Sequence, residues 1–126
     1  MNAPRRSPHP SELTLARAHG LFNVVSGLWP LLHMPSFERV LGPKTDRWLV
    51  RTVAGLLVAN GLVQVRAEPS AVAMAQARRI GVGTAATLMA VDLVYAPPRR
   101  ISRVYLLDAV AEGLWVAAWW RSRRLG

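Results

Sequence analysis

The chain has 126 residues, 52% of them hydrophobic, with 16 basic and 7 acidic side chains and a formal net charge of +9. This length allows one domain and excludes most large enzyme folds. Because the chain has no cysteine, disulfides, thiolate catalysis and cysteine-ligated metal centres are excluded. A strongly basic chain normally suggests nucleic-acid binding, but a hydrophobic share this high favours a membrane, so we expect no nucleic-acid partner.

Four stretches with few charged residues follow one another along the chain, at residues 18–34, 48–65, 80–96 and 104–120. As helices they would each be about 26 Å long, at the short end of what crosses a hydrocarbon core of about 30 Å. Most arginines and the turn-forming pairs Gly42-Pro43 and Pro97-Pro98 lie between the stretches. The pattern predicts an all-α fold, a four-helix transmembrane bundle with both termini on the same side.

The first stretch shows the polarity expected of a membrane helix. Nearly all of its residues are apolar. The polar ones lie on one narrow line along the helix: His19, Asn23, Ser26 and His33. A soluble four-helix bundle, the alternative, would show a broad polar face and a narrower apolar stripe. A polar seam on an apolar cylinder instead suits a helix with lipid outside and protein inside. Pro30 within this stretch is expected to kink the helix or end it early.

The charge distribution predicts how the chain is organised and oriented. We expect a polar segment over residues 1–17, the four-span bundle over residues 18–120 and a basic tail over residues 121–126. More arginines fall on the face with both termini, so the positive-inside rule places the termini in the cytoplasm and the protein in the cytoplasmic (inner) membrane as a multi-pass protein. Aromatic residues form two belts, one toward each side: Trp29, Trp48, Tyr95 and Tyr105, and then Trp119 and Trp120.

Local signals refine the third and fourth helices. Ser70 after a proline is a good N-cap, so the third helix should begin at Ala71 and end before Pro97. Small residues recur four apart in both helices, a spacing that lets helix backbones approach closely in lipid. These rows are Ala86 and Ala90 in the third helix, and Ala109, Gly113 and Ala117 in the fourth. The rows predict that the two helices are neighbours.

Three carboxylates lie inside the predicted spans: Asp92, Asp108 and Glu112. Asp108 and Glu112 are four residues apart and therefore share one helix face with Tyr105 and Trp115. Counting residues from one side of the membrane places Arg51, Asp92 and Asp108 at a similar depth, with Glu112 deeper. A charged side chain at mid-bilayer costs at least about 2.5–3.5 kcal/mol, so these residues need a partner or a function.

Three interpretations of the carboxylates remain open. Arg51 could pair with Asp92 or Asp108 and hold the bundle together. Uncompensated carboxyl groups beside aromatic rings could instead take up a proton or hold a cationic ligand. The acids could also be solvated in a water-filled vestibule. For the second interpretation the ligand-binding residues are Asp92, Asp108, Glu112, Arg51, Tyr95, Tyr105, Trp115 and His33.

Other chemistry finds little support in the sequence. There is no HExxH helix, phosphate-binding glycine loop or nucleophile elbow, so we assign no catalytic residue and expect no cofactor. His19 and His33 are about 21 Å apart along one helix, too far to share a metal ion, and no metal site is predicted.

Several motifs carry a resemblance. The stretches Gly27 to His33, Ser36 to Glu38, Gly42 to Val50 and Ile101 to Asp108 resemble small four-span bacterial membrane proteins of uncharacterised function. The likeness covers most of the chain from Leu15 onward and implies a fold and a membrane, but no activity. The acidic and aromatic seam is also distantly similar to the sterol-isomerase and sigma-2-receptor-like family, in which intramembrane carboxylates meet a cationic ligand. That similarity is one of fold alone.

The sequence therefore leaves three hypotheses for function. The first is binding or transport of a small cationic or apolar molecule, or of a proton, at the acidic and aromatic site. The second is a non-catalytic accessory or assembly subunit, whose partners are the lipid bilayer and another membrane protein or further copies of this chain. The third is an intramembrane isomerase with Glu112 or Asp108 and His33 as its acid–base pair.

Overall fold

The computed structural model describes residues 10–98 and 100–125, with side chains described as far as Ser122. All regular structure in this part of the chain is helical, in five helices. They are α1 (Pro10–Leu32), α2 (Met34–Leu41), α3 (Arg47–Val65), α4 (Ala71–Tyr95) and α5 (Tyr105–Leu125). The all-α prediction is confirmed, and each long helix overlaps one predicted stretch. The short helix α2 lies between the first and second predicted stretches, where the sequence predicted no helix.

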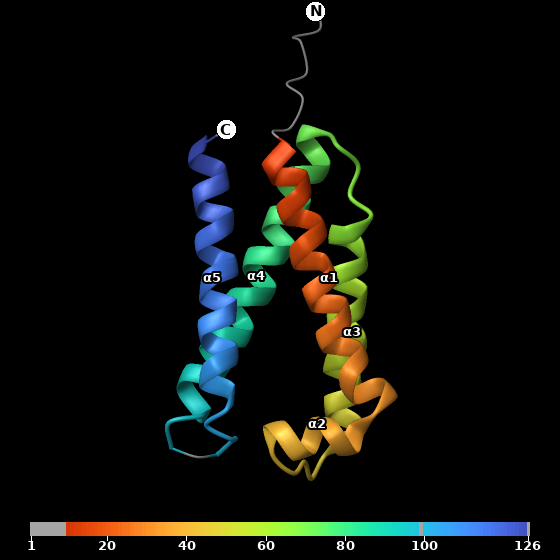
Figure 1. Cartoon of the computed structure of the whole chain (residues 1–126), viewed down its shortest axis with the longest axis vertical. Coiled ribbons are helices and arrows are strands. Elements are labelled where there is room, and N and C mark those ends of the chain that lie inside the picture. The colour runs from red at the N-terminus through yellow and green to blue at the C-terminus, as the bar shows by residue number, and fades with distance from the viewer. Residues whose placement is uncertain (1–9, 99, 126) are drawn as a thin grey trace, which may run out of the picture.

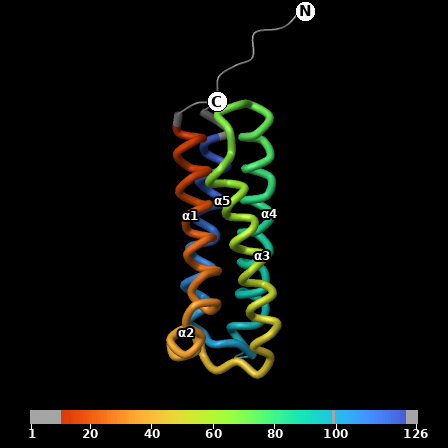
Figure 2. Tube along the Cα trace, turned by 90° about the vertical axis from the view of Figure 1, so that its right-hand side faces the viewer, coloured from red at the N-terminus to blue at the C-terminus, as the bar shows by residue number. Residues whose placement is uncertain are grey.

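The long helices form two antiparallel hairpins, α1 with α3 and α4 with α5 (Figure 1). The start of α1, the α3–α4 connection and the end of α5 lie at one end of the bundle, which we call the α3–α4 end (Figure 2). α2 and the α4–α5 connection lie at the opposite end, which we call the α2 end. The start of α1 and the described end of α5 therefore lie at the same end of the bundle.

Glycines allow α1 and α3 to pack with their backbones almost in contact. A Cβ atom added to Gly20 would lie 2.6 Å from the carbonyl oxygen of Gly61, and one added to Gly61 would lie 2.6 Å from that of Gly20. Seven residues along α1, a Cβ added to Gly27 would lie 2.5 Å from the carbonyl oxygen of Ala54. Among the described helices this pair has the most extensive contact, and no residue larger than glycine fits at these crossing points without a shift of the backbone.

The prediction that the third and fourth long helices are neighbours is confirmed, because α4 packs along α5. The row on α5 takes part in this contact: Ala109 is buried, and a Cβ added to Gly113 would lie 3.4 Å from Met89 Sδ. Ala86, Ala90 and Ala117 are exposed, so these parts of the predicted rows face away from the partner helix.

Two local predictions can be compared with the helix ends. Ser70 caps α4 as expected: its Oγ accepts a hydrogen bond of 3.1 Å from the backbone N–H of Ala73, and the helix ends at Tyr95, shortly before the prolines. Pro30 lies inside α1, which ends two residues later at Leu32. At the outer ends, α1 begins at Pro10 and α5 runs to Leu125, so both helices extend beyond residues 18–120.

The described side chains have an unusual polarity. Four of the six largest side chains that are fully buried are polar: His19, Asn23, Gln64 and Glu112. Large apolar side chains cover the outside, among them Leu107 with 71% of its surface exposed and Leu114 with 66%. Large buried polar side chains together with this many exposed large apolar ones are unusual for a protein surrounded by water.

One helix in the described residues, α3, is long and apolar enough by itself to cross a membrane, with a mean hydropathy of 1.4. A single helix of this kind is weak evidence, because the core helix of a soluble protein has the same composition. The structure thus establishes an all-α bundle with one candidate span.

Candidate functional site

The structure brings the three predicted carboxylates together between α4 and α5, near the α2 end. Asp92 comes from the last turn of α4, and Asp108 and Glu112 come from the first two turns of α5. The carboxyl groups of Asp92, Asp108 and Glu112 are close enough to interact electrostatically with one another. Asp92 is 3% exposed and Glu112 is 1% exposed, whereas Asp108 is half-buried. We call these three residues the acid group.

The acid group has no cationic partner among the described residues. The two ion pairs in that part of the chain join Arg47 to Glu38 and Arg78 to Glu12. Asp92 Oδ2 and Glu112 Oε2 are buried and have no hydrogen-bond partner. Two carboxyl oxygens are therefore buried without a compensating charge or donor.

Arg51 is not the counter-ion that the sequence suggested. Its side chain is exposed on α3 and forms no ion pair. Residue counting gives a position along the bundle axis, but it does not say toward which side of the bundle a side chain points. A long arginine side chain in the first turns of a helix can also extend toward the helix end.

The predicted aromatic residues are distributed over different surroundings. Tyr105 is half-buried and interacts with Asp92 and Asp108, so it borders the acid group. Tyr95 is 44% exposed. Trp115 lies one turn from Glu112 toward the α3–α4 end, where its ring stacks on His19 at 4.6 Å between centroids. Only Tyr105 is thus shown to border the acid group.

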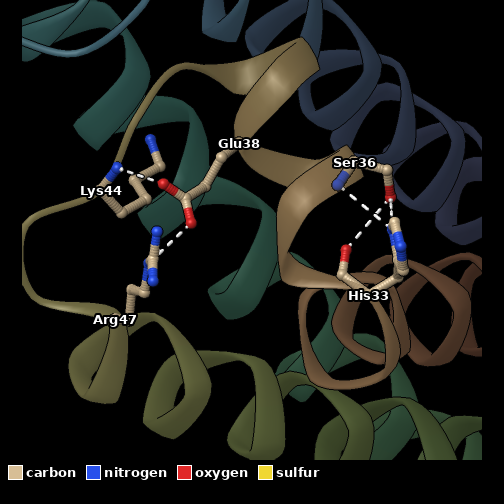
Figure 3. Close-up of polar contacts among 5 residues, drawn as sticks. All are labelled: His33, Ser36, Glu38, Lys44 and Arg47. Carbon is tan, nitrogen blue, oxygen red and sulfur yellow. Dashed lines mark hydrogen bonds and ion pairs between the residues drawn. The ribbon is translucent and has the colours of Figure 1, made fainter.

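His33 has a structural role at the α2 end (Figure 3). Its Nδ1 atom accepts a hydrogen bond of 3.2 Å from the backbone N–H of Ser36 and lies 2.7 Å from Ser36 Oγ, so it caps the start of α2. The same hydroxyl accepts a hydrogen bond of 2.9 Å from the indole N–H of Trp29. The exposed His33 ring makes no contact with the acid group, and an acid–base pair with Glu112 or Asp108 finds no support.

The loop after α2 is held by Glu38 (Figure 3). Glu38 Oε2 accepts a hydrogen bond of 3.0 Å from the backbone N–H of Lys44, and Glu38 Oε1 lies 2.7 Å from Arg47 Nε. The Lys44 N–H and then the Arg47 guanidinium hold the pKa of Glu38 below its ordinary value, against an opposing effect of desolvation. The chain between α2 and α3 is therefore fixed by one carboxylate.

Lys44 connects this loop to the neighbourhood of the acid group. Its Nζ lies 4.5 Å from the centre of the Tyr105 ring and 6.0 Å from that of Phe37, within the range of cation–π interactions. Burial lowers the pKa of Lys44, while the charge of Glu38 raises it. The sequence placed Lys44 in a loop and gave no signal for this contact.

A second polar cluster lies farther toward the α3–α4 end, and we call it the His19 network. Trp119 Nε1 donates to His19 Nδ1 at 3.0 Å, Gln64 Nε2 lies 3.1 Å from the same atom, and Asn23 Nδ2 donates to Gln64 Oε1 at 2.7 Å. All four side chains are 0% exposed. They come from α1, α3 and α5, so the network links the two hairpins.

The remaining long helix, α4, makes room for this network. A Cβ added to Gly81 of α4 would lie 2.6 Å from Gln64 Nε2 and 3.0 Å from both His19 Nδ1 and Trp119 Nε1. The sequence placed His19 and Asn23 on the inward seam, which is confirmed, but it did not join them to Gln64 and Trp119. The burial of Trp119 also corrects its assignment to an outer aromatic belt, whereas Trp120 is 61% exposed.

Neither cluster resembles a metal centre, since no group of three or more His, Asp or Glu side chains in the described residues could hold a metal ion. The chain matches no protein-family model, and the comparisons with curated proteins and with solved structures also found no match. Its function must therefore be argued from the geometry of these two clusters.

Proposed function

We propose that the chain is an integral protein of the cytoplasmic membrane in which α1, α3, α4 and α5 each span the bilayer. The buried polar side chains and the exposed large apolar side chains of the described residues support this proposal. Apolar residues such as Leu107, Val110 and Leu114 line the outer face of α5, and that helix turns Glu112 and Trp119 inward. The hydrocarbon core of a bilayer cannot solvate polar side chains, so these face the inside of the bundle. Apolar side chains are compatible with hydrocarbon and face outward.

This burial pattern is one reason why α3 alone among the described helices is a candidate span, and in α4 the arginines Arg78 and Arg79 also count against it. α1, α4 and α5 each bury polar side chains that lower the mean hydropathy of the helix without touching its outer surface; these include His19, Asn23, Asp92 and Glu112. The mean hydropathy of a helix counts buried and exposed residues equally, so it understates how apolar the outer surface of the helix is. Arginines near the α3–α4 end, such as Arg66 and Arg79, favour the cytoplasmic side for that end under the positive-inside rule.

The absence of cysteine gives a direct test of this topology. Single cysteines would be introduced at Thr45 in the α2 end, at Glu68 in the α3–α4 connection and at Leu114 on the outer face of α5, all three exposed in the structure. With a membrane-impermeant maleimide, we expect Thr45→Cys and Glu68→Cys to be labelled from opposite sides. Leu114→Cys should stay unlabelled until detergent is added. Rapid labelling of Leu114→Cys in intact membranes would contradict a membrane-spanning α5.

Within this bundle, the acid group is the proposed site for a small cation, a proton included. The observation that carries this function is the burial of Asp92 and Glu112 beside the half-buried Asp108, with no cationic side chain of the described residues paired to any of the three. Leaving an ionised side chain unpaired inside a bilayer costs at least about 2.5–3.5 kcal/mol, so positive charge must come from protons or from a ligand. Tyr105 borders the acid group, and Lys44 Nζ lies 4.5 Å from the centre of its ring.

Binding at the acid group can be tested with a cation and a carboxyl reagent. Tetramethylammonium should raise the unfolding temperature of the purified protein, and a hydrophobic carbodiimide, which attacks protonated carboxyl groups, should modify the acid group. Protection from the carbodiimide by tetramethylammonium would identify a cation site, and modification without protection would identify a proton site.

Matched variants show whether the acid group is responsible. Asp108→Asn and Glu112→Gln should lose both effects while keeping the helical fold, and Glu38→Gln, which changes a carboxylate outside the bundle interior, should keep both. Loss of the fold in both acid-group variants would assign these residues to structure. Unchanged tetramethylammonium binding and carbodiimide modification in those variants would refute the site.

A groove between α3 and α4 favours a second function, that of an accessory subunit in a membrane complex or a homo-oligomer. It has a volume of about 400 Å³, and its lining includes Leu56, Asn60, Gly83 and Thr87. A Cβ added to Gly83, or to Gly55 on α3, would meet nothing within 4 Å, so both glycines are free to contact another helix. Gly83→Leu should release a bound partner in mild detergent, and a protein that purifies alone as a monomer would speak against this function.

A further inference from the structure

The His19 network has two hydrogen-bonding atoms left over. His19 Nε2 and Asn23 Oδ1 are buried and have no partner, although both side chains are 0% exposed. Buried polar atoms are nearly always hydrogen-bonded, to protein or to a bound molecule. The chemistry of these two atoms therefore indicates what occupies the space beside them.

The indole of Trp119 determines which nitrogen of His19 carries the hydrogen. An indole N–H can only donate, and it donates to His19 Nδ1 at 3.0 Å. Nδ1 must then present its lone pair, so the neutral ring carries its hydrogen on Nε2. The free nitrogen of His19 is a donor.

The same reasoning orients the two amides. Because His19 Nδ1 is an acceptor, Gln64 must direct its NH₂ group toward it, at 3.1 Å. Gln64 Oε1 is then available to accept from the NH₂ group of Asn23 at 2.7 Å. This leaves Asn23 Oδ1 free, and the free atom of Asn23 is an acceptor.

The two free atoms belong to neighbouring side chains of α1. His19 and Asn23 are four residues apart on one face of the helix, and in each side chain the other polar atom contacts Gln64. Trp115 stacks on the His19 ring, and Glu112 lies one turn from Trp115 toward the α2 end. Asn23 lies one turn from His19 in the same direction, since α1 and α5 run antiparallel. Glu112 Oε2, itself buried without a partner, is thus near the level of Asn23.

We propose that His19 Nε2 and Asn23 Oδ1 form a subsite for a neutral hydroxyl group beside the acid group. A hydroxyl accepts one hydrogen bond, here from Nε2–H, and donates one, here to Oδ1. A carboxylate or phosphate anion has no hydrogen to donate to Asn23, and a metal ion cannot bind a nitrogen that carries a hydrogen. The hydroxyl comes from a bound water or from the molecule held by the acid group. Only this second source rests on the proposed function.

Nuclear magnetic resonance on protein labelled with ¹⁵N-histidine tests the subsite. The chain has three histidines, and the signals lost in His19→Gln identify this one. We expect a neutral ring with its hydrogen on Nε2. That hydrogen should show a cross-peak to water, or it should shift on addition of choline but not of tetramethylammonium, which lacks the hydroxyl. A hydrogen on Nδ1, a doubly protonated ring, or an Nε2–H that responds to neither water nor choline would overturn the proposal.

Variants separate this subsite from the proposed cation site. Asn23→Leu removes the acceptor at similar volume, so the response of Nε2–H to water or choline should disappear, while Ser26→Ala, on the same seam, should keep it. A response that survives in Asn23→Leu would refute the subsite, and if that variant does not fold, the wild-type spectrum decides. A water cross-peak without any tetramethylammonium binding would retain the subsite and reject the cation function. Tetramethylammonium binding without a response of Nε2–H to water or to choline would retain the cation function and reject the subsite.

Discussion

Substituting Gly61 by alanine tests the close crossing of α1 and α3. The new Cβ would lie 2.6 Å from the carbonyl oxygen of Gly20 and 2.9 Å from the backbone nitrogen of Val24. Both are backbone atoms, so no side chain can turn aside. Restoring an ordinary contact of 3.4 Å from 2.6 Å requires the helices to separate by about 0.8 Å at this point.

The cost of this separation is weaker packing along the whole interface between the two helices. A gap of about 0.5–1 Å removes a quarter to a half of the dispersion energy between facing atoms, and overpacking of a tight interior typically costs about 1–3 kcal/mol. The gain in helix propensity from glycine to alanine is at most about 1 kcal/mol. We therefore expect Gly61→Ala to destabilise the protein by about 1–2 kcal/mol in the free energy of unfolding.

Unfolding followed by circular dichroism in detergent measures this difference, and α3 provides a matched control. A Cβ added to Gly55 would meet nothing within 4 Å, so Gly55→Ala should be neutral or slightly stabilising. Gly20→Ala forces the same separation as Gly61→Ala, and the double variant should therefore cost clearly less than the two single costs added together. Equal stability of Gly61→Ala and Gly55→Ala would refute the close crossing.

Three further substitutions have expected outcomes. Gly81→Ala should destabilise the protein by about 1–3 kcal/mol, measured by unfolding, because the new Cβ displaces the His19 network; unchanged stability would mean that the network is packed more loosely than these distances indicate. Trp119→Phe removes the donor to His19 and should cost about 0.5–1.5 kcal/mol, with the ring hydrogen no longer fixed on Nε2 in NMR spectra. The pKa of Glu38 is lowered below 4.5, first of all by the N–H of Lys44, so its contribution to stability is present above that pH and is lost as the pH falls through the lower folded-state pKa. Glu38→Gln should remove this part of the acid dependence of the unfolding midpoint, and an identical pH profile would contradict it.

Helical periodicity explains which parts of the interior could be predicted. The seam of α1 placed His19 and Asn23 inward, and the four-residue spacing of Asp108 and Glu112 placed both carboxylates on one face of α5. Asp92 lies in the last turn of α4, and Asp108 lies in the first turn of α5. A short connection makes the two helices antiparallel, so these two turns lie at the same end of the bundle.

The sequence also determined the all-α fold, the four long helices and the cap at Ser70, since these depend on local composition and on turn chemistry. Tertiary structure alone decided which side chains meet across the bundle. The bond between His19 and Trp119 joins residues 100 positions apart, and the Gly20–Gly61 crossing depends on the register of two helices. Arg51 shows the limit most clearly: a residue's depth follows from counting along the helix, but its partner depends on rotation about the helix axis, which packing against the other helices sets.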